Sequence, residues 1–199
     1  MNVALPRRAW LVVLLAALPG CVPPAAAPPP AVPAAIAPVS VDVTRIRPEA
    51  TIGTSIAQVP GLTQLAREAA VADATALLDG AGPYTLFAPT DSAYARLAED
   101  VPAALLAPEN RVTLQLLLRD HLVAGAVSEA DLVARIRAGG GRATLTSLAG
   151  QPIVATLDGD VVMLTSSSGS RAYIETADRR QANGVIHVIN GVLVPTLTE

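Results

Sequence analysis

Apolar residues recur at helical spacing in the first half of the region that begins near Thr51. Leu62, Leu65, Ala66 and Ala69 fall on one face of a 3.6-residue period and predict a helix. The same period, together with capping residues and glycine or proline stops, predicts further helices. They cover residues 74–78, a segment opening at 90–91, a segment opening at 108–110, and a segment that follows the Ser-Glu-Ala-Asp capping pattern at 128–131.

The pattern changes to short extended runs after the three glycines at 139–141. The predicted strands cover residues 143–148, 153–157, 161–165, 172–176 and 185–193, and an earlier strand covers 84–88. Apolar residues stand at both parities of 185–189, which indicates a strand that is covered on both faces. Helices first and strands later predict an α+β domain.

The first 20 residues are typical of an export signal. Arg7 and Arg8 form a positive n-region, and the apolar run at 10–18 is too short for a permanent membrane span. The sequence Leu-Pro-Gly-Cys that ends at Cys21 resembles a bacterial lipoprotein signal, which implies a lipid on the cysteine thiol and anchoring to the cell envelope. The alternative is an ordinary secretory signal, a secreted protein and an incidental Cys21. Either Sec or twin-arginine export is compatible with the arginine pair.

Residues 21–50 are expected to form a stalk behind this cysteine. Segment 22–38 has seven prolines in seventeen residues, the rest being almost entirely alanine and valine. Prolines at this density favour polyproline II and give a semi-rigid spacer, roughly 50 Å long if it is fully extended. The globular domain is expected to span residues 51–197.

The charge of the chain excludes some partners. The first 20 residues contain two arginines and no acidic residue, so the remainder has 12 basic and 17 acidic side chains and a formal net charge of −5. Its one basic run is Arg179-Arg180. We therefore expect no binding to nucleic acid, and membrane contact only through an N-terminal lipid.

Two segments of the chain resemble the signature segments of a known family. Segment 183–195 contains two Asn-Gly pairs, an apolar run around His187 and a closing proline, and segment 85–94 contains Phe-Ala-Pro-Thr-Asp at 87–91. Together with the order of helices and strands, they make residues 51–195 resemble a fasciclin-like domain. The resemblance implies an α+β fold in which helices pack on a β-wedge or sandwich, and a function in adhesion or interaction rather than catalysis.

The same resemblance selects positions that we expect to be mainly structural. They are Thr90, Asp91, His121, Asn183, Gly184, His187 and Asn190. Two positions depart from the family pattern. Asp120 replaces an aromatic residue that, with the following histidine, is linked to receptor adhesion in some members. Asn190 stands where an aspartate is frequent.

His121 and His187 are the only histidines, and both lie in apolar patterns. A histidine in such a setting is usually neutral and bonded to backbone or to a carboxylate. The alternative is a metal site that adds Asp91 or Asp178, but the spacing matches no short zinc-ligand motif. We therefore predict no metal and no cofactor.

An enzymatic reading rests on two weak candidates. Thr90 and Asp91 could supply a catalytic acid, but their position after a strand and before a helix predicts capping. The serines at 166–170 could supply a nucleophile beside His187 and Asp178, but no Gly-x-Ser-x-Gly elbow is present, and a serine-glycine tract is by default a flexible loop. We expect no enzyme.

The expected function is therefore that of an exported, lipid-anchored adhesion or interaction module of the cell envelope, with a protein or surface partner that the sequence does not identify. The alternative is a carrier of a small apolar ligand in a pocket between helices and sheet. The low aromatic content, 3% of residues, favours adhesion over the carrier, because ligand pockets are usually lined by aromatic side chains.

Overall fold

The computed structural model describes residues 41–196. The expected signal peptide, Cys21 and the stalk up to residue 40 lie outside the described residues, as do 197–199. Among the helices of the described region, none is long and apolar enough to cross a membrane.

Most helices precede the main run of strands, as the apolar period predicts. The 3₁₀ helices are η1 (Val43–Arg45) and η2 (Pro108–Asn110), and the α-helices are α1 (Ile52–Gln58), α2 (Thr63–Val71), α3 (Thr75–Leu78), α4 (Asp91–Tyr94), α5 (Val101–Leu105), α6 (Arg111–Asp120) and α7 (Glu129–Ala138). Helices α1 and α5 were not among the predicted elements. Both are short, and α5 has no buried residue that would give it an apolar stripe.

Within residues 41–196, seven strands form one sheet in the order β2-β1-β7-β6-β5-β4-β3. Their bounds are β1 (Tyr84–Pro89), β2 (Leu122–Ala124), β3 (Arg142–Thr146), β4 (Pro152–Asp158), β5 (Val161–Thr165), β6 (Arg171–Gln181) and β7 (Gly184–Ile189). Only the β1–β7 pair is parallel. A bridge between Val123 and Ser147 joins the two ends of the strand order, so the sheet curls almost closed. The α+β class is confirmed.

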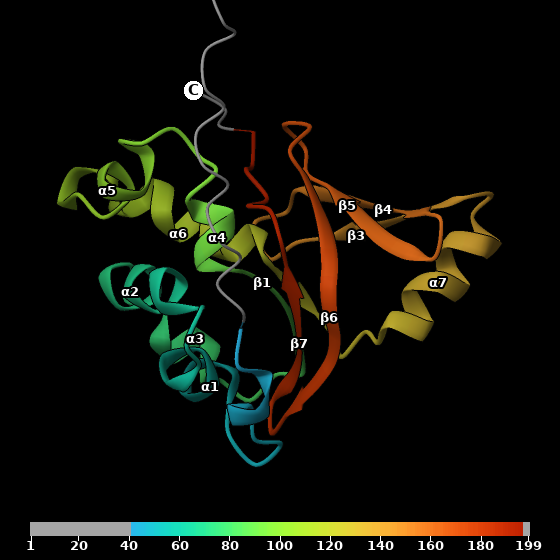
Figure 1. Cartoon of the computed structure of the whole chain (residues 1–199), viewed down its shortest axis with the longest axis horizontal. Helices are drawn as coiled ribbons and strands as arrows, with labels where there is room; N and C mark the ends of the chain where they lie inside the picture. The colour runs from blue at the N-terminus through green and yellow to red at the C-terminus, as the bar shows by residue number, and fades with distance from the viewer. Residues whose placement is uncertain (1–40, 197–199) are drawn as a thin grey trace, which may run out of the picture. The chain divides into compact units, whose positions relative to one another are not determined.

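The sheet separates two hydrophobic clusters. Cluster 1 contains apolar residues of α1, α2, α4 and α6 together with Ile186 and Val188 of β7. Cluster 2 contains residues of α7 and β3–β6 together with Phe87 of β1 and Ile189 of β7. Figure 1 shows α1–α3 on one side of β1 and β7, and α7 beside β3–β5. Strand β7 is thus covered on both faces, as its apolar pattern predicts, although it ends at Ile189 and not at residue 193.

Side-chain caps fix where several helices begin. Thr90 Oγ1 accepts the N–H of Ala93 at the start of α4 over 3.1 Å. Ser128 and Asp131 form a complete capping box at the start of α7, as the sequence predicts. Such caps satisfy N–H groups that have no partner inside the helix and contribute about 1 kcal/mol each.

Packing of the chain begins before Thr51. Val41, Val43 and Ile46 are partly buried against cluster 1, and the N–H of Ala182 donates to the carbonyl of Ala50 over 2.8 Å. The segment just before Thr51 therefore contributes to the fold and is not only stalk.

Glu68 of α2 is a carboxyl group buried in the helical layer. It has no exposed surface and no cationic partner within residues 41–196. It accepts hydrogen bonds from the Tyr94 hydroxyl over 2.7 Å and from the Gln64 side-chain amide over 3.3 Å. Burial raises its pKa to about 7, against the opposing effect of these two donors.

We expect Glu68→Gln to gain stability relative to wild type as the pH rises. The pKa of Glu68 is 4.5 in the unfolded chain and about 7 when folded, so the unfolded chain loses its proton first and the free energy of unfolding falls between these values. The difference between variant and wild type should grow by about 3 kcal/mol from pH 4.5 to 8. Urea unfolding across this range measures it, with the exposed Glu175→Gln as the control for charge removal; a constant difference would contradict the prediction.

Candidate functional site

Asn183 connects the β6–β7 turn to the helical layer. Its side-chain oxygen accepts the N–H of Ile52 over 2.9 Å, and its amide donates to the carbonyls of Leu78 and Gly80, each over 2.8 Å. The next residue, Gly184, lies so close to β1 that an added Cβ would overlap the carbonyl oxygen of Tyr84. The Asn-Gly pair therefore does more than turn the chain, because it holds β7 against β1 and against two helices.

His121, at the end of α6, joins that helix to the C-terminal segment. The ring is buried, Nδ1 donates to the Leu117 carbonyl over 2.8 Å, and Nε2 accepts the N–H of Leu193 over 3.0 Å. An acceptor role at Nε2 assigns the neutral Nδ1–H tautomer. Burial lowers the pKa of His121 to about 4, so the ring is neutral at physiological pH.

His187 of β7 is the other neutral tautomer, with its proton on Nε2 instead of Nδ1. Nε2 donates to the Val127 carbonyl over 2.8 Å, and Nδ1 accepts the N–H of Asp178 over 3.3 Å. The ring stacks on Phe87 with centroids 5.6 Å apart, and burial lowers its pKa. All ring nitrogens of the two histidines are bonded to backbone, and residues 41–196 contain no group of three or more His, Cys, Asp or Glu side chains that could hold a metal. The expected absence of a metal stays a prediction for the whole chain.

The remaining family positions also make structural contacts. Asp91 caps α2 from a distance, since its carboxylate accepts the N–H of Gln64 over 2.8 Å. Asn190 binds Tyr173 of β6 twice, through its side-chain oxygen and its own N–H, over 2.9 and 3.1 Å. Both contacts are structural, since one caps a helix and the other joins β6 to the residue that follows β7.

Asp120, which stands where the family pattern has an aromatic residue, is fully buried. One carboxylate oxygen accepts the Ser147 hydroxyl over 2.7 Å, and Oδ2 has no partner within the described chain. Burial raises the pKa of Asp120. A residue with no exposed surface offers no receptor contact, so adhesion through an aromatic-histidine pair has no counterpart here.

The serine loop at 166–170 holds the C-terminal segment. The Ser168 hydroxyl donates to the Val194 carbonyl over 2.7 Å, and the Ser170 hydroxyl accepts the Val194 N–H over 2.8 Å. Ser167 accepts the N–H of Thr196 over 2.9 Å. The described hydrogen bonds of these serines include none to His187, whose ring nitrogens are already engaged. The loop is therefore bonded in place rather than free, and it forms no hydrolase triad.

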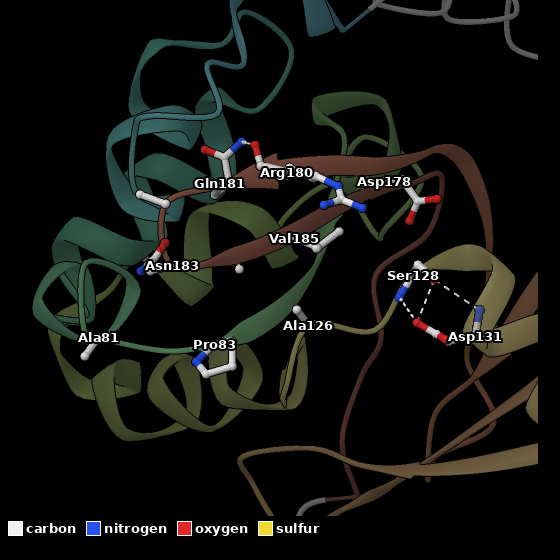
Figure 2. A pocket seen from close by; sticks show the side chains of 12 residues that line it. Ala81, Pro83, Ala126, Ser128, Asp131, Asp178, Arg180, Gln181, Asn183 and Val185 are labelled. Atoms are coloured by element: carbon white, nitrogen blue, oxygen red, sulfur yellow. Dashed lines mark hydrogen bonds between the residues drawn. The ribbon is translucent and has the colours of Figure 1, made fainter.

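A pocket of about 540 Å³ lies where the turn end of the sheet meets the start of α7, and Figure 2 shows it. Its walls come from the segment before β1, the loop before α7, and the facing ends of β6 and β7. Its lining residues are Ala81, Pro83, Ala126, Ser128, Asp131, Asp178, Arg180, Gln181, Ala182, Asn183, Gly184 and Val185. We call it the turn pocket; several of its lining residues, among them Asp178, Asn183 and Gly184, stand out in the sequence for other roles, and no spacing predicts that they meet in a pocket.

A smaller apolar pocket of about 170 Å³ lies between α5, α6 and the C-terminal segment. Its lining residues are Leu97, Val101, Leu105, Thr113, Leu117, Val192, Val194 and Pro195. Ligand sites usually measure about 300–1,000 Å³, so this pocket is small for a carrier. It also borders the C-terminal segment instead of lying between helices and sheet, where the carrier alternative expects its ligand.

We expect Asn183→Ala to lower the free energy of unfolding by about 3 kcal/mol, because it leaves a buried N–H without a partner and removes donors from two carbonyls. The control is Asn110→Ala, whose amide donates to Ala104 at an exposed site and should cost under about 1 kcal/mol. Equal losses in urea unfolding would contradict the assignment.

His121→Ala should lower the free energy of unfolding by about 4 kcal/mol at pH 7, because it leaves a cavity and a Leu193 N–H without a partner. The pKa of His121 is 6.5 unfolded and about 4 folded, so the wild type loses its histidine contribution as the pH falls through this window. The difference in free energy of unfolding between wild type and variant should therefore be about 3 kcal/mol smaller at pH 4 than at pH 7. A gap that does not change with pH, or stoichiometric zinc in purified wild type, would overturn this role.

Comparison with known proteins agrees with this architecture. The chain matches the fasciclin domain family over residues 60–195. Protein sll1483 of Synechocystis sp. is 35% identical over 127 residues, 63% of each chain. The transforming growth factor-beta-induced protein ig-h3 of Sus scrofa is 31% identical over 120 residues, 60% of this chain and 16% of its own.

A solved structure has the same fold. A FAS1 domain pair from the insect cell adhesion molecule fasciclin I superposes with a TM-score of 0.65 at 18% identity, over 73% of this chain and 51% of that one. The matched part of the chain thus spans less than two thirds of each: 63% of sll1483, 51% of the solved domain pair and 16% of ig-h3. Since the family match covers residues 60–195, which include β1, α6 and β7, the chain belongs to the fasciclin domain family.

Proposed function

We propose that this protein is a lipid-anchored adhesion or interaction module of the bacterial cell envelope. The observation that carries the proposal is the family match over residues 60–195. Fasciclin domains are generally adhesion and interaction modules, and proteins that contain them are typically extracellular or secreted. The solved relative is itself described as a cell adhesion molecule.

The N-terminal sequence supports the anchored form of this function. Cys21 follows a signal-like segment and is the only cysteine, so its thiol is not needed for an internal disulfide. Segment 22–38 then supplies a proline-rich spacer ahead of the domain. A spacer of this kind suits a module whose partner lies beyond the anchoring membrane.

The side-chain chemistry supports binding rather than catalysis. Both histidines are neutral and have their ring nitrogens bonded to backbone, so neither is free to act as a general base. The buried acids Glu68 and Asp120 have no exposed surface, so a substrate would have no access to them.

The anchor is tested by replacing Cys21. We expect the wild-type chain, expressed in its own source, to partition into detergent and to carry the added mass of a lipid, and Cys21→Ser to appear without that mass in the aqueous phase. Ser167→Ala, far from the signal in sequence, serves as the control variant. Identical partitioning and mass of wild type and Cys21→Ser would refute anchoring.

Adhesion is tested on cells that lack the protein. Attachment of these cells to one another and to surfaces should fall, and the full chain should restore it. The Cys21→Ser chain should restore it less, because an unanchored module cannot hold the cell to its partner. Unchanged attachment without the protein would overturn the adhesive function while leaving the anchor intact.

A further inference from the structure

The turn pocket has the size of a small-ligand site and is not used by the proposed function. Its volume of about 540 Å³ lies within the range of sites that enclose small molecules. Pro83, Ala126 and Val185 give one part of the wall short apolar side chains. Figure 2 shows Arg180 next to Val185, and Asp178 and Asp131 farther toward α7.

Arg180 lines the turn pocket with a guanidinium group that is not paired in the described part of the chain. Its side chain is exposed, and its guanidinium group has no ion-pair or hydrogen-bond partner within residues 41–196. Its cross-strand partner is Val185, which lines the same pocket. A guanidinium group in this position is free to bind a carboxylate through two parallel hydrogen bonds.

Two carboxylates of the turn pocket, Asp178 on β6 and Asp131 on α7, are held in place by hydrogen bonds to one oxygen each. Asp178 Oδ1 accepts the N–H of Glu129 over 2.9 Å, and Asp131 Oδ2 accepts the N–H and hydroxyl of Ser128 over 3.0 and 2.6 Å. The second oxygen of each carboxylate accepts no hydrogen bond in the part of the chain that the structure describes. Both side chains therefore cap α7, and each keeps one acceptor oxygen that no described group uses.

We propose that the turn pocket binds a short zwitterionic peptide with small apolar side chains. The peptide carboxylate pairs with Arg180, its ammonium group donates to the free oxygens of Asp131 and Asp178, and its side chains lie against Pro83, Ala126 and Val185. Two carboxylates beside one guanidinium group disfavour a simple anion, and the cation disfavours a simple amine. A ligand that carries both charges complements both sets of groups.

Calorimetry on the full-length chain in detergent tests this proposal with L-alanyl-L-alanine as the probe. We expect saturable binding at the pocket, weakened about tenfold when the probe is N-acetylated and about tenfold when its carboxyl group is amidated, because each change removes one charge-assisted contact. Absence of saturable binding would overturn the proposal, as would equal affinity for the three probes.

Arg180→Gln locates the site. The variant should bind alanyl-alanine about tenfold more weakly and should no longer distinguish the free from the amidated peptide, while still distinguishing the N-acetylated one. The matched control is Arg142→Gln, an exposed arginine that begins β3 and does not line the pocket. Unchanged binding by Arg180→Gln, with both variants folded by circular dichroism, would refute the assignment. Since these measurements do not involve cell attachment, their failure leaves the adhesive function standing.

Discussion

Strand β7 is buried on both faces, and the rest of the domain is arranged to cover it. Ile186 and Val188 of β7 enter cluster 1 and Ile189 enters cluster 2, so the helical layer and the curled part of the sheet meet along this one strand. A strand in this position cannot leave polar groups unpaired, because a buried donor or acceptor without a partner costs about 1–3 kcal/mol. The parallel pairing with β1 and the close approach of Gly184 to Tyr84 follow from the same requirement.

The family-motif side chains meet that requirement as polar crosslinks. His121, His187 and Asn183 each bind backbone groups of segments that are distant in the sequence, and the two histidines do so as opposite neutral tautomers. This use of histidine gives both imidazole rings of the motif a structural role, because every ring nitrogen is bonded to backbone. It leaves the surface, including the turn pocket, as the part of the domain that is free to contact partners.

Local signals in the sequence were sufficient for most elements and insufficient for the contacts between them. Periodicity and caps predict α2, α6, α7 and the two-sided burial of β7, since these depend on neighbouring residues. Strand β2 has only three residues and directly follows α6, so it has no pattern of its own. The capping of α2 by Asp91 and the turn pocket both depend on segments brought together by the sheet, which no spacing encodes.

The most direct test of the structural role of these crosslinks is the protonation state of the two imidazole rings, measured by ¹⁵N NMR at pH 7. The structure predicts two neutral rings in slow exchange with water, with the proton on Nδ1 of His121 and on Nε2 of His187. A charged ring, or rapid exchange between tautomers at either histidine, would show that the ring nitrogens are not committed to the backbone and would contradict the account.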